Sequence, residues 1–172
     1  MLNNKLEEAL NKQINAEFWS AYLYLSMSLN FENAGLTGIA NWFKIQFQEE
    51  QAHAQIFMDY VNKRGGRVEL QPIDAVPTKW DTPLSAFEDT LKHEKVVTSL
   101  INNLFALAEE VRDYASRDRI MWFVTEQVEE EDSANTLIEK LRRVGNDGMG
   151  LYLIDQELAT RTYTAPAPLS GE

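Results

Sequence analysis

At 172 residues the chain is long enough for one ordinary domain with a sizeable hydrophobic core. It has no cysteine, which excludes disulfides, thiolate metal sites and thiol nucleophiles, so any bound metal must be held by oxygen and nitrogen ligands. Its 27 acidic and 16 basic residues give a net charge of -11, which disfavours nucleic acid and anionic membranes and favours cations as partners.

The start of the chain, "MLNNKLEEALNKQ", has no basic segment followed by an apolar run. No stretch elsewhere stays apolar for the length that a membrane span requires. We therefore expect a soluble cytoplasmic protein with no membrane partner.

Apolar residues recur at spacings of three and four along most of the chain, which predicts an all-α fold. Four long helices are expected over residues 4–33, 36–64, 83–112 and 114–144, followed by a short fifth helix over 151–161. The last segment is rich in Pro, Ala and Ser and is expected to be flexible. The predicted organisation is one domain over 1–162 and a tail over 163–172.

The connection from Gly65 to Pro83 has no helical period and is long for a structureless link inside a compact domain. Fully extended it covers about 60 Å, whereas the preceding helix is about 43 Å long. The link can therefore cross the whole length of a bundle and leave helices two and three parallel. This pattern is typical of a four-helix bundle with one long crossover.

Each of the four long helices carries one glutamate in its most apolar stripe. They are Glu17, Glu50, Glu94 and Glu130. Three lie near the middle of their helices and Glu94 lies about one turn earlier, so in antiparallel pairs they can share one level. The sequence therefore predicts four carboxylates converging inside an apolar bundle.

Burying an ionised carboxylate costs on the order of several kcal/mol unless a positive charge compensates for it. The four stripes contain no Lys or Arg that could do so. Two divalent cations would balance four glutamates. His53 follows Glu50 by three residues, so both side chains can bind one ion. Ligation almost entirely by oxygen, with one imidazole, suits iron or manganese better than zinc.

A purely structural interpretation stays open for each glutamate taken alone, because a single Glu in an apolar stripe is more commonly a snorkelling side chain. Four at one level, together with Glu-x-x-His, favour the metal site. His93 lies beside Glu94 and points off the core stripe, so an ordinary surface histidine is expected there.

A second acidic group adjoins the first. It comprises Glu49, Glu126 and Glu129, which form either an outer metal site or a solvated acidic face. Tyr24, seven residues after Glu17, is a candidate to hydrogen-bond a ligand or supply an electron, and equally a plain core tyrosine. Trp122 is equally ambiguous, with packing in the core or between subunits favoured.

Motifs spread over nearly the whole chain resemble those of the ferritin family, specifically its bacterial non-haem branch. They are "NAEFWSAYLY", "QEEQAHAQIFMDY", "KHEK", "EQVEEE" and "GLYLIDQEL". The resemblance implies a ferritin-like four-helix bundle with a short C-terminal fifth helix, assembled into a hollow cage of twenty-four identical subunits.

The resemblance also implies how the metal ligands are shared. One iron would be bound by Glu17, Glu50 and His53, and a second by Glu50, Glu94 and Glu130, with Gln127 nearby. A third iron would be bound by Glu49, Glu126 and Glu129 together with Glu130. The catalytic group expected on this basis comprises Glu17, Tyr24, Glu50, His53, Glu94, Gln127 and Glu130.

The activity implied is that of a ferroxidase and iron-storage protein, which oxidises Fe(II) with O2 at the paired site and stores ferric oxyhydroxide in the cage. Haem-containing members of the family carry a second Glu-x-x-His on the fourth helix; this chain has no histidine there, which argues against a permanently bound di-iron cofactor. By the same resemblance no haem is expected, because a methionine on the second helix would bind it and Met58 lies past His53 rather than just before it. The alternatives are a di-iron oxidase or oxygenase acting on an organic substrate and a non-catalytic helical module.

Overall fold

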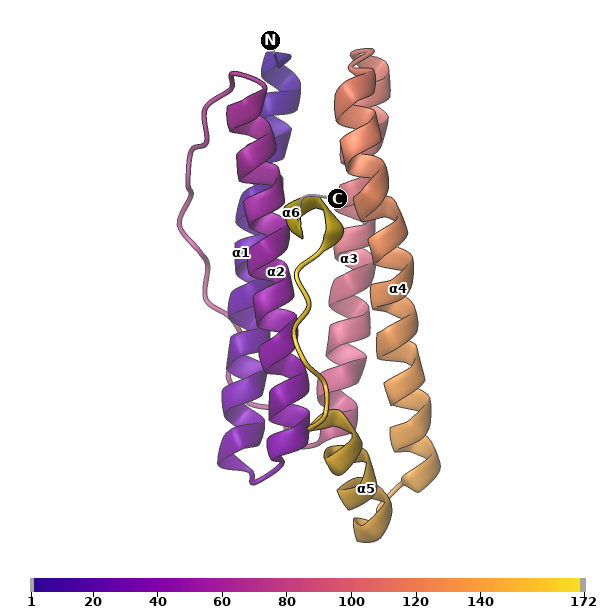
Figure 1. The fold of residues 1–172 in the computed structure, drawn as a ribbon. Helices are drawn as coiled ribbons and strands as arrows, with labels where there is room; N and C mark the ends of the chain where they lie inside the picture. The colour runs from indigo at the N-terminus through magenta and orange to yellow at the C-terminus, as the bar shows by residue number, and fades with distance from the viewer. Residues whose placement is uncertain (1, 171–172) are drawn as a thin grey trace.

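The computed structural model describes residues 2–170, and its regular structure over that range is entirely helical. Four long helices form a bundle, and two short ones follow it (Figure 1). They are α1 Asn4–Asn33, α2 Thr37–Lys63, α3 Pro83–Glu110, α4 Tyr114–Val144, α5 Gly148–Leu158 and α6 Ala167–Ser170. The predicted all-α ferritin-like bundle with a fifth helix is confirmed, with the long helices ending within two residues of their expected bounds.

The ends of the helices are set by local sequence. Thr82 and Ser85 form a reciprocal capping box with Pro83 between them, which fixes the start of α3. Gly35 and Gly65 follow α1 and α2 with φ of 78° and 73°, a left-handed conformation that terminates a helix at little cost for glycine.

The fifth helix starts and ends three residues earlier than the sequence predicted. The Asp147 carboxylate accepts hydrogen bonds from the backbone N–H groups of Met149 and Gly150, at 3.2 and 3.1 Å. This cap satisfies the first turn and lets α5 begin at Gly148, inside a glycine-rich stretch that looked like a loop.

The bundle core consists of two hydrophobic clusters, one at each end. Phe43 and Phe87 stack at one end with ring centroids 4.9 Å apart, and Phe57 and Phe123 stack at the other at 4.0 Å. On every long helix the stripe glutamate lies between the segments that supply the two clusters. The four glutamates therefore form a polar layer across the middle of the core.

Short turns join α1 to α2 and α3 to α4, so the bundle is built of two hairpins. The crossover over residues 64–82 runs along the outside of α1 (Figure 1) and makes α2 and α3 parallel, as predicted.

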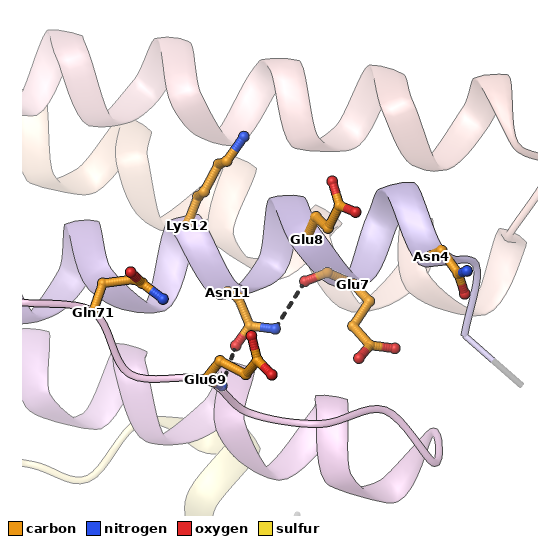
Figure 2. Close-up of a pocket in the computed structure, with 7 residues that line it drawn as sticks. All are labelled: Asn4, Glu7, Glu8, Asn11, Lys12, Glu69 and Gln71. Carbon is orange, nitrogen blue, oxygen red and sulfur yellow. Dashed lines mark hydrogen bonds between the residues drawn. The ribbon is translucent and has the colours of Figure 1, made fainter.

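Hydrogen bonds to α1 hold this crossover in place. Its first part borders a polar surface pocket of about 630 Å³ (Figure 2). There Asn11 donates a hydrogen bond to the Arg67 carbonyl and accepts one from the Glu69 N–H, at 2.9 and 2.8 Å. Further on, Ser26 donates to the Pro77 carbonyl at 2.7 Å.

Helix α5 docks against the start of α2. The Asp155 carboxylate accepts a hydrogen bond of 2.9 Å from the Ile39 N–H, which caps α2 from outside the bundle. A Cβ at Gly38 would lie 1.7 Å from the Asp155 carbonyl oxygen, so this close approach requires glycine. The chain then turns back along α2 to α6 (Figure 1).

The expected domain of 1–162 and flexible tail of 163–172 stay predictions, and Met1 and residues 171–172 lie outside the described part. Among the helices that the structure describes, none combines the length and apolarity that crossing a bilayer would require. Cytoplasmic localisation also stays a prediction.

Candidate metal centre

The middle layer of the bundle brings the predicted ligands together. We call this group the inner cluster; it comprises Glu17, Glu50, His53, Glu94 and Glu130, all buried. Ligand atoms of Glu17, Glu50 and His53 all lie within 4.8 Å of one another, a spacing that one metal ion can bridge. The His53 Nδ1 lies 3.2 Å from a Glu50 carboxylate oxygen, as the Glu-x-x-His spacing indicated.

Burial dominates the electrostatics of the inner cluster. It raises the pKa of the Glu17 carboxyl from 4.5 to about 7, helped by repulsion from Glu94, while the hydrogen bond from Gln13 opposes the shift. Burial followed by repulsion from the neighbouring carboxylates raises the pKa of Glu50 and of Glu130 well above the usual range. A divalent cation at this place would supply positive charge that offsets both the cost of burying these carboxylates and the repulsion between them.

The imidazole of His53 is in the protonation state that can bind a metal. Burial lowers its pKa from 6.5 to about 4, so the ring is neutral at pH 7, which is the form that binds a metal. The rings of Trp122 and Phe123 meet its ring edge-on, with centroids 5.7 and 5.6 Å away. These contacts fix the plane of the imidazole, and Trp122 is half-buried within the subunit.

Tyr24 and Gln127 both donate to Glu94. The Tyr24 hydroxyl bonds one carboxylate oxygen, and the Gln127 amide bonds the other at 3.0 Å. Both oxygens of Glu94 are thus oriented, and the tyrosine interacts directly with a candidate ligand. Burial, which is only partly offset by these two bonds, raises the pKa of Glu94.

Two glutamines that were not predicted as site residues hold two of the remaining carboxylates, those of Glu17 and Glu130. Gln13 donates to Glu17 at 2.8 Å, and Gln46 donates to Glu130 at 2.9 Å while its own carbonyl oxygen is buried without a hydrogen-bond partner. Gln13 precedes Glu17 by four residues, and Gln46 precedes Glu50 by four. A polar residue one helical turn before a stripe glutamate was the available signal for Gln13, whose partner lies on the same helix. This spacing does not identify the partner of Gln46, which lies on α4.

The second acidic group lies closer to solvent than the inner cluster. We call it the outer cluster; it comprises Glu49, Glu126 and Glu129, of which the first two are half-buried and the last is exposed. Burial, then repulsion from Glu129 and Glu49, raises the pKa of Glu126. These carboxylates are therefore close enough to interact with one another, and Glu49 also repels Glu130 of the inner cluster.

The expectation of a surface position for His93 is wrong. Its ring lies between α3 and α1, with centroids 5.1 Å from that of Trp19 and 6.1 Å from that of Tyr24, and its Nε2 lies 2.7 Å from the Ser20 hydroxyl. Burial lowers its pKa to about 4. The apolar face of α3 is wider than the single stripe through Glu94, so a residue beside the stripe still packs against α1.

Comparisons with known proteins agree with this architecture. A family model described as a ferritin-like domain matches residues 7–144. A bacterial non-heme ferritin of Bacteroides fragilis is 45% identical over 161 residues, covering 94% of this chain and 100% of its own length. The counterpart in Staphylococcus haemolyticus is 39% identical over 163 residues, covering 95% of this chain and 98% of its own.

Solved structures match equally well. An engineered closed form of the Archaeoglobus fulgidus ferritin superposes with a TM-score of 0.94 at 47% identity, covering 95% of this chain and all of that one. The open-pore ferritin from the same archaeon superposes with a TM-score of 0.93, also at 47% identity, over 94% of this chain and all of that one. With the inner cluster placed in the middle of such a bundle, the chain belongs to the ferritin family.

Proposed function

We propose that this protein is a ferroxidase and iron-storage protein, with Fe(II) as substrate and ferric oxyhydroxide as the stored product. The observation that carries the proposal is the inner cluster: four buried carboxylates and a neutral imidazole, without a lysine or arginine paired to them within residues 2–170. The curated relatives named above are bacterial non-heme ferritins, which supports iron as the substrate.

The ligands divide between two ions. Glu17, Glu50 and His53 would bind one Fe(II), and Glu50, Glu94 and Glu130 the second, with Glu50 bridging. Two irons held close together each give one electron, so O2 accepts two electrons and two protons to give hydrogen peroxide while both irons become Fe(III). Carboxylate oxygens favour the ferric product. Because the site has only one nitrogen ligand, Fe(III) would be bound weakly enough to leave it.

The surrounding residues act by orienting the ligands. Each of four side chains donates a hydrogen bond to one carboxylate oxygen and holds it in place; they are Gln13, Gln46, Gln127 and Tyr24. Because the carboxyls with raised pKa values are partly protonated near pH 7, binding of Fe(II) would release protons. The outer cluster, with Glu130, would bind a third iron.

We also propose assembly into a hollow cage of twenty-four copies. The structural relatives include ferritins from Archaeoglobus fulgidus, one in an open-pore form and one in an engineered closed form. The exposed apolar side chains on α4 and α5, among them Val128, Tyr152 and Leu153, are candidates for contacts between subunits.

The test is oxygen uptake after two Fe(II) per chain are added to the metal-free protein. We expect about one O2 consumed per two irons, and a rate at least about tenfold lower in His53→Ala. His93→Ala is the matched control, because it removes the other histidine and should change the rate far less. Equal rates in the wild type and His53→Ala would refute the site assignment.

A further inference from the structure

Arg161 ties the segment after α5 to the middle of α2. One guanidinium N–H donates to a Glu49 carboxylate oxygen at 2.7 Å, and another donates to the Trp42 carbonyl at 3.2 Å. The guanidinium carbon also lies 4.8 Å from the centroid of the Trp42 ring. The Arg161 and Glu49 side chains are 28% and 22% exposed, so the ion pair is only partly screened by solvent.

The backbone beneath Arg161 is fixed independently of Glu49. The Asn41 amide donates to the carbonyl oxygens of Leu158 and Arg161, at 3.1 and 3.0 Å. Helix α5 is itself held on α2 by the bond from Ile39 to Asp155. These backbone contacts position the guanidinium next to Glu49, so it would stay close to Glu49 if the ion pair opened.

Arg161 is placed where the outer cluster would bind a cation. Glu49 is close enough to Glu126 and Glu130 to contribute to the raised pKa of each. Among the residues that the structure describes, no other arginine or lysine forms an ion pair with Glu49, Glu126 or Glu129. The positive charge of Arg161 is therefore paired with Glu49, the residue of the outer cluster that also interacts with Glu130 of the inner cluster.

We propose that Arg161 competes with the metal ion for Glu49, so that the outer cluster binds iron only when the guanidinium is displaced. The inference rests on the third iron site in the proposed function. A guanidinium and a multivalent cation repel each other, and a single carboxylate cannot satisfy both at full strength. The competition lowers the affinity of the outer cluster for iron, so iron binds there transiently and is not stored there.

The experiment is calorimetric titration of the assembled, full-length, metal-free protein with Tb(III), which binds oxygen ligands and has no redox chemistry here. In Arg161→Ala we expect the weak class of sites to gain about two- to fivefold in affinity, the scale of a partly exposed ion pair. Arg161→Lys should gain less, because it keeps the charge but loses the stacking on Trp42. The tight class, from the inner cluster, should not change.

Glu49→Gln identifies the weak class, because it removes the shared carboxylate and should weaken that class in either background. If Arg161→Ala matches the wild type, or binds more weakly, while Glu49→Gln loses the weak class, the competition is refuted and the outer site stands. If Glu49→Gln changes no class, the outer site itself is refuted. Should Arg161→Ala fail to assemble, Arg161→Gln keeps a donor for the Trp42 carbonyl and removes the charge, with the same expectations.

Discussion

The inner and outer clusters are both acidic, yet the protein treats them differently. The inner cluster is buried and is held only by neutral donors, Gln13, Gln46, Gln127 and Tyr24. The outer cluster is partly exposed and receives a protein cation, Arg161. A buried group of carboxylates without such a cation is unstable at neutral pH unless metal ions supply the charge, whereas a half-exposed group tolerates a weaker and exchangeable partner.

The largest effect should come from removing the ligand that both inner ions would share. Glu50→Ala is expected to lower the rate of Fe(II) oxidation by about 100-fold or more, since it removes a ligand from each iron. Stopped-flow absorbance after anaerobic Fe(II) loading and mixing with O2 measures this rate. Glu139→Ala, an exposed glutamate on α4, is the matched control. A rate within twofold of the wild type in Glu50→Ala would break the distinction between the clusters.

The pH dependence of stability tests the unbalanced charge of the inner cluster. The pKa of Glu17 is about 7 in the folded chain against 4.5 for an ordinary glutamate, so the folded state holds the proton more tightly. The contribution of Glu17 to the free energy of unfolding is fully present below about pH 4.5 and is lost as the pH rises from there through 7, by about 3 kcal/mol for this group alone.

The histidines act in the opposite direction, because their pKa values of about 4 mean that stability is lost as the pH falls below 6.5. Above pH 6.5 the histidines are mostly neutral in the folded and the unfolded chain, so the change of stability with pH comes from the buried carboxyls. The Tm of the metal-free protein should therefore fall between pH 6.5 and 8, and Zn(II), a redox-inert occupant, should abolish most of that fall. Calorimetry at both pH values measures it, and a flat profile without metal would contradict the expectation.

Neutralising one inner carboxylate should stabilise the metal-free protein. Glu130→Gln keeps the shape and an acceptor for Gln46 while removing a charge whose ionisation is opposed by burial and by Glu94. We expect a gain of about 1–3 kcal/mol in the free energy of unfolding without metal. Glu129→Gln, the exposed neighbour in the outer cluster, should change it by less than about 0.5 kcal/mol. Chemical denaturation at pH 7.5 compares the two, and equal effects would remove the contrast between them.

The smallest expected effect concerns the hydroxyl of Tyr24. Tyr24→Phe leaves the ring in the core but removes the donor to Glu94, which should cost about 1 kcal/mol and slow iron oxidation a few-fold. Tyr152→Phe, at an exposed tyrosine, serves as the control in the same denaturation and oxidation assays. If Tyr24→Phe oxidised iron at the rate of the wild type, Tyr24 would be only a packing residue.

Much of this architecture could be predicted because helical period and the placement of single glutamates act through local geometry. The four helices, the crossover and the convergence of Glu17, Glu50, Glu94 and Glu130 all follow from that pattern. The start of α5 could not be predicted, because the Asp147 cap overrides two glycines.

The inward packing of His93 and the pairing of Arg161 with Glu49 depend on how separate elements meet, which no local pattern encodes. The ligand-orienting role of Gln46 likewise depends on where α4 lies relative to α2. Partners of a site that come from a different helix are therefore the part that required the structure.

The two-hairpin construction has a mechanical consequence. The first hairpin carries Glu17, Glu50 and His53, and the second carries Glu94 and Glu130. The hydrogen bonds from Tyr24 to Glu94 and from Gln46 to Glu130 cross the seam between them. In the proposed function, an ion shared by Glu50 and the carboxylates of the second hairpin would bind across that seam. Binding of iron should then strengthen the contact between the two halves of the subunit, and departure of the oxidised product should weaken it again.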